Sequence, residues 1–166
     1  MQAPDALIIG AGPAGLMAAE ELAKAGVKAV VCEAKPTVAR KFLMAGKSGL
    51  NVTKDEPWET FVTRYDAPQL LPILQEFGPV EVQAWCRALG QEVYTGSSGR
   101  VFPVEMKASP LLRSWLQRLT SQGVTIRTRW RWTGFNGSAF IFDTPSGQQA
   151  LTPKVSVLAL GGASWQ

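Results

Sequence analysis

The sequence predicts an α/β fold in which helices flank a parallel sheet. Three observations support this class. The first part of the chain, up to Glu33, has the pattern strand, glycine turn, helix and strand, which is the crossover unit of a parallel sheet. The middle of the chain is helical in pattern, and the last third alternates like short strands separated by turns. We therefore expect a parallel sheet with a helical insertion and a small β-meander.

The first crossover unit can be placed residue by residue. An apolar run over residues 5–10 ends in glycine and predicts a buried strand. Residues 13–25 predict a helix, with small and apolar residues on one face and charged residues, Glu20 among them, on the outer face. Gly26 stands where such a helix commonly ends, and residues 27–33 predict the second strand.

The middle of the chain is expected to contain several short elements. Residues 34–53 predict a loop with one helical turn, and glycine and proline then separate three short helices at 58–65, 68–77 and 80–89. A short strand is expected over 91–95 and a loop over 96–99. The next helix is expected over 109–122, with Ser109 as its N-cap and Pro110 at its first helical position.

The last third predicts strands over 124–135 and 139–144, joined by a hairpin turn at Asn136-Gly137. A buried strand follows over 155–160 and leads into a pair of glycines. Because strand ends of this kind usually lead into a ligand site, we expect the chain to continue in a longer protein. The expected domains are a first part of the nucleotide-binding domain (1–53), a helical insertion (54–110) and a return to that domain with the meander (111–166).

The residue composition limits the kinds of catalytic and metal site that the chain can contain. The chain has no histidine, which excludes Ser-His-Asp and Cys-His catalysis and most zinc chemistry. Cys32 and Cys86 are spaced neither as a metal pair nor as a Cys-x-x-Cys redox pair, and we expect two buried apolar thiols. No metal site is therefore expected, no catalytic residue can be named, and a cofactor is expected to carry the reaction.

Charge and hydropathy limit the partners. The net charge of +4 comes from scattered Lys and Arg, which suits an anionic cofactor and does not require nucleic acid. Over 127–132 arginines alternate with other residues, a pattern that can bind single strands, but a half-buried strand with Trp130 and Trp132 inward is favoured. Trp58, Trp85 and Trp115 are expected in the core. Without an apolar run long enough for a membrane span or a signal peptide, we expect a cytoplasmic protein.

One motif points to a function. Residues 10–15 form the pattern Gly-x-Gly-x-x-Gly, which closes a predicted strand and opens a predicted helix. Glu33 follows Gly15 by 18 residues, where an acidic side chain can accept hydrogen bonds from a ribose diol. These features predict a Rossmann-type dinucleotide site, and the charge of Glu33 disfavours the ribose 2′-phosphate of NADP. FAD is favoured, while an NAD-binding dehydrogenase domain and a non-catalytic nucleotide-binding fragment remain as alternatives.

Several segments resemble a known family. Residues 5–33 look like the FAD fingerprint of glutathione-reductase-like flavoproteins. Residues 40–53, 99–103 and 158–162 resemble segments of the HI0933-like, or BaiN-like, flavoproteins, a family with aminoacetone-oxidase-like members. That family usually has Arg-Cys before the asparagine that matches Asn51, whereas this chain has Gly-Leu. The resemblance implies the N-terminal portion of an FAD-dependent oxidoreductase that acts on a small molecule, with NAD(P)H as a candidate electron donor.

The resemblance also implies cofactor contacts, which follow the cofactor from its pyrophosphate to its two ends. For the pyrophosphate, the matching positions are Gly10, Gly12, Pro13, Ala14 and Gly15. For the ribose, they are Glu33, Ala34 and Lys35. Along the cofactor toward the flavin, they are Lys41, Gly46 and Asn51. At the adenine the match is the backbone of Trp132, and the positions that would close over the FAD are Gly161 and Gly162.

Overall fold

The computed structural model describes residues 3–162, and its contacts divide the chain into two compact units. Unit 1 consists of Met1–Phe42 and Leu116–Gln166, and unit 2 consists of Leu43–Trp115. Helices α2 (Arg40–Ala45) and α6 (Ala108–Ser121) each run across a point of division. The expected domain boundaries after residues 53 and 110 differ from these divisions and stay predictions.

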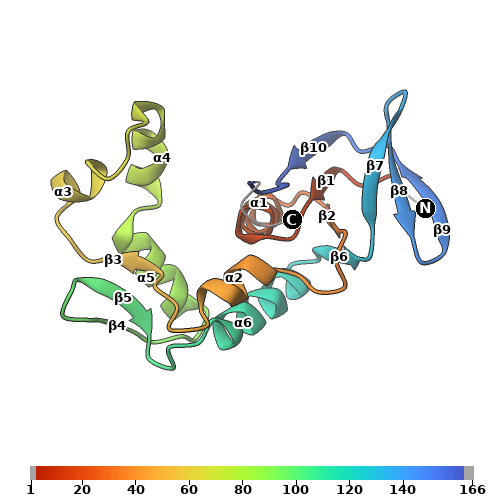
Figure 1. Ribbon diagram of the computed structural model, residues 1–166. Coiled ribbons are helices and arrows are strands. Elements are labelled where there is room, and N and C mark those ends of the chain that lie inside the picture. Colours follow the sequence, from red (N-terminus) through yellow and green to blue (C-terminus); the bar gives the residue numbers. More distant parts are fainter. Residues whose placement is uncertain (1–2, 163–166) are drawn as a thin grey trace. The chain divides into compact units, whose positions relative to one another are not determined.

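Unit 1 is built on a parallel sheet that confirms the predicted fold class (Figure 1). Within the described residues, four strands follow the order β10-β1-β2-β6, and each neighbouring pair is parallel. Their bounds are β1 (Ala6–Ile9), β2 (Ala29–Glu33), β6 (Thr125–Thr128) and β10 (Val155–Leu158). All four residues of β1 are buried, as expected for a central strand that is covered on both faces.

Helix α1 (Pro13–Lys24) connects β1 to β2 as predicted. Gly12 is its N-cap and Pro13 its first residue, a position where the missing proline N–H costs nothing. After the C-cap Ala25, Gly26 adopts a φ of +75°, the left-handed conformation that commonly ends a helix. The glycine turn at the start of α1 therefore lies directly after the end of β1.

The β-meander covers the face of the sheet opposite α1 (Figure 1). Its antiparallel strands are β7 (Arg131–Asn136), β8 (Ala139–Thr144) and β9 (Gly147–Leu151). Leu7, Ile9 and Cys32 from the sheet form one buried cluster with Phe140, Phe142 and Leu151 from the meander. The predicted hairpin at Asn136-Gly137 is confirmed, since Asn136 pairs with Ala139 across the turn.

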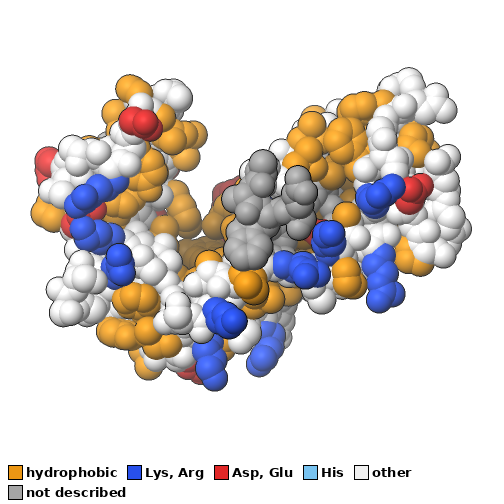
Figure 2. Space-filling view, in the orientation of Figure 1, with side chains coloured by type: hydrophobic (Ala, Val, Ile, Leu, Met, Phe, Trp, Pro, Cys, Tyr) orange, Lys and Arg blue, Asp and Glu red, His pale blue; other side chains and the backbone are white. Residues whose placement is uncertain are grey.

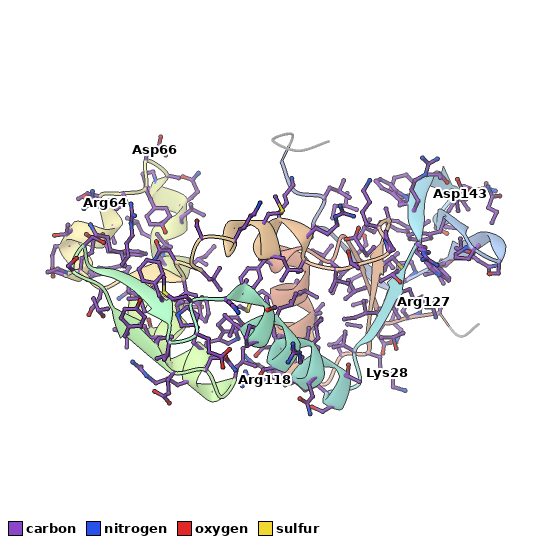
Figure 3. The ribbon with its side chains drawn as sticks, turned by 60° about the horizontal axis from the view of Figure 1, so that its bottom comes forward. Lys28, Arg64, Asp66, Arg118, Arg127 and Asp143 are labelled. Atoms are coloured by element: carbon purple, nitrogen blue, oxygen red, sulfur yellow. The ribbon has the colours of Figure 1, made fainter. Side chains whose placement is uncertain are left out.

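The single strand predicted over 124–135 is wrong. It is broken between β6 and β7 at Arg129, whose φ of +58° turns the chain out of the sheet. Of the arginines in this segment, Arg129 and Arg131 are exposed. Arg127 of β6, labelled in Figure 3, is half-buried instead, and its guanidinium carbon lies 4.5 Å from the centre of the Trp130 ring.

Unit 2 contains the predicted helices and a small sheet that was not predicted. Its helical segments are α3 (Trp58–Val62), a 3₁₀ turn (Pro68–Leu70), α4 (Leu71–Glu76) and α5 (Pro79–Ala88). Its antiparallel strands follow the order β3-β5-β4, with bounds β3 (Thr53–Lys54), β4 (Val93–Thr95) and β5 (Arg100–Pro103). The strand expected over 91–95 is confirmed as β4, whereas β3 and β5 were not predicted because strands of two to four residues are too short to show a period.

Helix α6 begins one residue earlier than predicted. Because Ala108 is its first residue, Ser109 lies inside the helix and is not the N-cap, and Pro110 is the third helical residue. Trp115 is buried as predicted and packs edge-on against Trp85, with 4.8 Å between the ring centroids. Trp58, also predicted for the core, is 37% exposed.

Candidate dinucleotide-binding site

The first and third glycines of the motif are required by the backbone of unit 1 itself. Gly10 has a φ of +104°, and a Cβ atom there would collide with the carbonyl oxygen of Ala159 just beyond β10. A Cβ atom on Gly15 would collide with the carbonyl oxygen of Gly10. These two positions allow β1, β10 and α1 to meet in close contact.

The second glycine differs from the other two. Gly12 has an extended backbone, with φ −79° and ψ 179°, which any residue can adopt. A Cβ atom built on it would meet no heavy atom within 4 Å. Because neither strain nor packing requires glycine here, its effect is to leave the space beside the turn open. A bound group can therefore approach the backbone at this point.

The N-terminus of α1 offers free hydrogen-bond donors beside that space. The helix has no side-chain cap and no acidic residue in its first turn. Within residues 3–162, the N–H groups of Gly12, Ala14 and Gly15 have no acceptor, and the first intrahelical bond is donated by the Leu16 N–H. Free N–H groups and the positive end of the helix dipole favour an anion such as a phosphate.

Glu33 lies at the edge of the same turn. Its Oε2 accepts a hydrogen bond from the Ala11 N–H at 2.9 Å, and its Oε1 accepts one from the Lys35 N–H at 2.9 Å. The end of β2 is held there as well, because the Gly10 N–H donates to the Cys32 carbonyl at 2.8 Å. The carboxylate is thus fixed next to the glycine turn, with lone pairs left on both oxygens for further donors.

Two later segments return to this edge of unit 1. The Lys41 ammonium donates to the Gly162 carbonyl oxygen at 3.0 Å, and it lies 3.6 Å from the Cβ position of Gly161. The loop after β2 is tied to the turn, because the Ala39 N–H donates to the Ala11 carbonyl at 2.8 Å. The structure therefore brings Lys41 and both late glycines together, and it holds the loop that carries Lys41 against the turn.

Three of the predicted contacts are engaged in packing of their own. The Trp132 indole N–H donates to the Gly134 carbonyl at 2.8 Å, and its ring packs edge-on against Phe135. Gly46 and Asn51 belong to unit 2. Gly46 packs so closely on Ala108 that a Cβ atom would collide with it. The Asn51 amide donates to the carbonyls of Thr53, at 2.6 Å, and Val101, at 3.2 Å.

Comparison with known proteins decides the family. A sequence model of the HI0933-like protein Rossmann domain matches residues 4–166. The chain belongs to this family. The FAD-binding type of Rossmann domain expected from the sequence agrees with this membership.

Related proteins agree with the family. A stretch of 86 residues is 38% identical to the FAD-dependent monooxygenase ankC of Aspergillus thermomutatus, and it covers 51% of this chain and 13% of that protein. The 3-ketosteroid-delta4-(5alpha)-dehydrogenase of Rhodococcus jostii RHA1 has a similar structure, with a TM-score of 0.70 at 15% identity over 96% of this chain and 46% of the other. The structure of Thermovibrio ammonificans THI4 is also similar, with a TM-score of 0.60 at 18% identity over 96% of this chain and 58% of the other. The matches thus cover between 13% and 58% of the length of these three proteins.

Sequence reasoning missed two residues of the site in this HI0933-like domain, Ala39 and Ala159, and one ion pair away from the site. Ala39 adopts a left-handed φ of +52° and Ala159 contacts Gly10 through its carbonyl, and an alanine gives no sequence signal for either role. Glu20, expected on the outer face of α1, is fully buried, because Arg118 of α6 reaches its Oε1 at 3.1 Å. Only a long-range contact between the two helices reveals this pair.

The two thiols of the HI0933-like domain are buried. Burial raises the pKa of Cys32 to about 12 and that of Cys86 to about 11, so both stay protonated near neutral pH. Both are free cysteines, as the sequence predicted. Across residues 3–162, no group of three or more His, Cys, Asp or Glu residues is placed to hold a metal ion, and none of the helices is long and apolar enough to cross a membrane.

Proposed function

We propose that the chain is the FAD-binding part of a flavin-dependent oxidoreductase that acts on a small-molecule substrate in the cytoplasm. One observation supports this most directly. The open space at Gly12 lies beside three N–H groups without acceptors, and the Glu33 carboxylate is fixed at the same turn. A diphosphate and a neighbouring ribose diol match these two features in charge and in hydrogen-bonding capacity.

Each part of the site has a proposed role. The N–H groups of Gly12, Ala14 and Gly15 would hold the pyrophosphate, with Gly10 and Pro13 shaping the turn. The Glu33 carboxylate would accept hydrogen bonds from the ribose, flanked by the exposed Ala34 and Lys35. The ammonium of Lys41, together with Gly161 and Gly162, would close the edge of the site. When bound, the flavin supplies electron transfer, and the protein supplies binding and orientation.

The remaining predicted contacts belong to the same proposal. Gly46 and Asn51 would lie along the cofactor toward the flavin, and the backbone of Trp132 would meet the adenine. NAD(P)H is proposed as the electron donor of the longer enzyme. Because the Glu33 carboxylate would repel a ribose 2′-phosphate, NADP is not expected in the site of the glycine turn itself.

Replacing Gly12 with alanine tests the proposal. The wild-type chain is titrated with FAD and followed by the flavin absorbance at about 450 nm. Because the new methyl group would enter only the open space, we expect Gly12→Ala to fold normally and to bind FAD at least about tenfold more weakly. Gly96→Ala is the matched control, since a Cβ atom there meets only ordinary contacts in unit 2 and should leave binding unchanged.

Other results would overturn the proposal. If the wild-type chain bound NAD in preference to FAD, the site would belong to a dehydrogenase domain. If it bound neither dinucleotide while circular dichroism showed a folded protein, the chain would be a fragment without a nucleotide site. Equal FAD affinity in Gly12→Ala and wild type would show that the pyrophosphate does not bind at the glycine turn.

A further inference from the structure

Unit 2 contains a cavity of about 530 Å³, all of whose lining residues belong to that unit. Its walls come from residues 51–54 and 98–100 on one side, and from α3, α4 and α5 on the other. Sites for small ligands commonly have volumes of roughly 300–1,000 Å³. We propose that this cavity binds a small carboxylate that carries an apolar, ring-sized body.

The charges on the cavity wall favour an anion. The lining contains three cationic side chains, those of Lys54, Arg64 and Arg100, and one carboxylate, that of Glu56. It therefore carries an excess of two positive charges. Figure 2 shows Lys and Arg side chains gathered on this face of unit 2 around α3 and β3, and Figure 3 labels Arg64 beside them. A negatively charged ligand is therefore attracted, and a cation is repelled.

Glu56 already forms ion pairs with two of these cations. Its Oε2 lies 2.8 Å from the Lys54 ammonium and 3.0 Å from Arg64 Nη2, while Arg64 Nε donates to Oε1 at 3.3 Å. Arg64 and Lys54 hold the pKa of this carboxyl below its ordinary value, so it remains charged near neutral pH. Arg100 has no carboxylate within 4.0 Å in the part of the chain that the structure describes. Its guanidinium is the group that a ligand carboxylate would meet.

Much of the remaining cavity lining is apolar. Phe61, Leu74 and Phe77 line the cavity from the helical side, and Phe77 is 39% exposed although it is a large hydrophobic residue. Tyr65 is exposed to the same extent and adds a further aromatic ring. An aromatic or aliphatic body packed here would cover this surface while its carboxylate reached Arg100. The ligand class follows from the charged and the apolar lining residues together.

This binding assignment rests on residues of unit 2 and does not require FAD, although one lining residue, Asn51, is also proposed to lie along the cofactor. If the ligand is also the substrate of the proposed flavoenzyme, that further step rests on the proposed function. The carboxylate-binding assignment and the proposed function can be tested separately, because carboxylate binding and FAD binding are measured independently on the same protein.

Two probes that differ in charge test the assignment. 4-Phenylbutyrate and its neutral amide are each titrated into the chain at low ionic strength by isothermal titration calorimetry. We expect the acid to bind about fivefold or more tightly than the amide, as one charged hydrogen bond would give. Arg100→Gln should remove this preference. Arg113→Gln, an exposed substitution on α6 outside the cavity wall, should keep it.

The assignment is wrong if the acid and the amide bind equally, or if neither binds to wild type at about 1 mM. It is also wrong if Arg100→Gln retains the preference for the acid. The comparison of the two probes on wild type is decisive even if the variant fails to fold. FAD titration of the same wild-type sample shows whether the proposed function holds when this assignment fails.

Discussion

A single carboxylate organises the glycine turn. Both oxygens of Glu33 accept backbone N–H groups, one from the turn at Ala11 and one from the loop at Lys35. The same group is therefore a structural anchor before any ligand arrives, and under the proposed function the carboxylate that would accept the ribose is already fixed in place. Preorganisation of this kind lowers the free-energy cost of binding.

Replacing Glu33 with glutamine should weaken FAD binding about tenfold. The amide keeps the size of the side chain, but it loses the charge and one of the two acceptor oxygens, which costs roughly 1–2 kcal/mol of binding free energy. Fluorescence titration with FAD measures the change. Glu21→Gln is the control, because that glutamate is exposed on α1 and pairs only with Lys24 among the contacts described. Wild-type affinity in Glu33→Gln would contradict the role of the carboxylate.

Arg129 is held in a conformation that suits glycine better. Its φ of +58° lies in the left-handed region at the break between β6 and β7, and its side chain is exposed. Arg129→Gly should therefore raise the free energy of unfolding by up to about 1 kcal/mol, as measured by urea denaturation. Arg131→Gly, at an exposed position within β7, should lower it, since glycine is unfavourable in a strand. Equal destabilisation by both changes would refute the strain at Arg129.

At the scale of the elements, α1 is attached to α6 by a buried charge. Glu20 is fully buried on α1, and Arg118 of α6 (Figure 3) reaches its Oε1 at 3.1 Å with 23% of its own side chain exposed. Lys24 lies 3.3 Å from the same oxygen on the solvent side. The helix whose N-terminus is proposed to hold the phosphates is thus held in place partly by an ion pair near its other end.

Removing the arginine should leave Glu20 buried with less compensation. We expect Arg118→Met to lower the free energy of unfolding by about 2–4 kcal/mol, measured by urea denaturation. The double variant Glu20→Gln with Arg118→Met should recover part of the loss, because the buried charge is then absent. Lys24→Met is the surface control and should cost less than about 1 kcal/mol. A loss no larger in Arg118→Met than in this control would show that the pair is unimportant.

At the scale of the whole molecule, local patterns predicted unit 1 better than unit 2. The buried run of β1, the amphipathic α1 with Gly26 after it, and the turn at Gly137 are each visible within a dozen residues. The sheet β3-β5-β4 was missed because its pairing joins Thr53 to Val101, and no local period records such a pairing. The break at Arg129 was missed because arginine gives no signal for a left-handed conformation.

In the candidate site too, some residues could be predicted from the sequence and others could not. The glycines and Glu33 could be predicted because each has a residue type that its role requires. The supporting contacts at Ala39 and Ala159 use backbone groups that every residue has, so the sequence contains no trace of them. The cavity of unit 2 depends on segments that are far apart in the chain, and it could be found only from the structure.

The order of strands also affects how the protein folds during synthesis. β1 pairs on one side with β2, which follows within a few tens of residues, and on the other with β10, where Ile9 pairs with Leu158. The ribosome therefore releases the glycine turn long before it releases β10, the strand that pairs with β1 beside it. Unit 2 lies within one continuous stretch and can collapse first, whereas the contacts between β1 and β10 beside the glycine turn can form only after residue 158 has emerged.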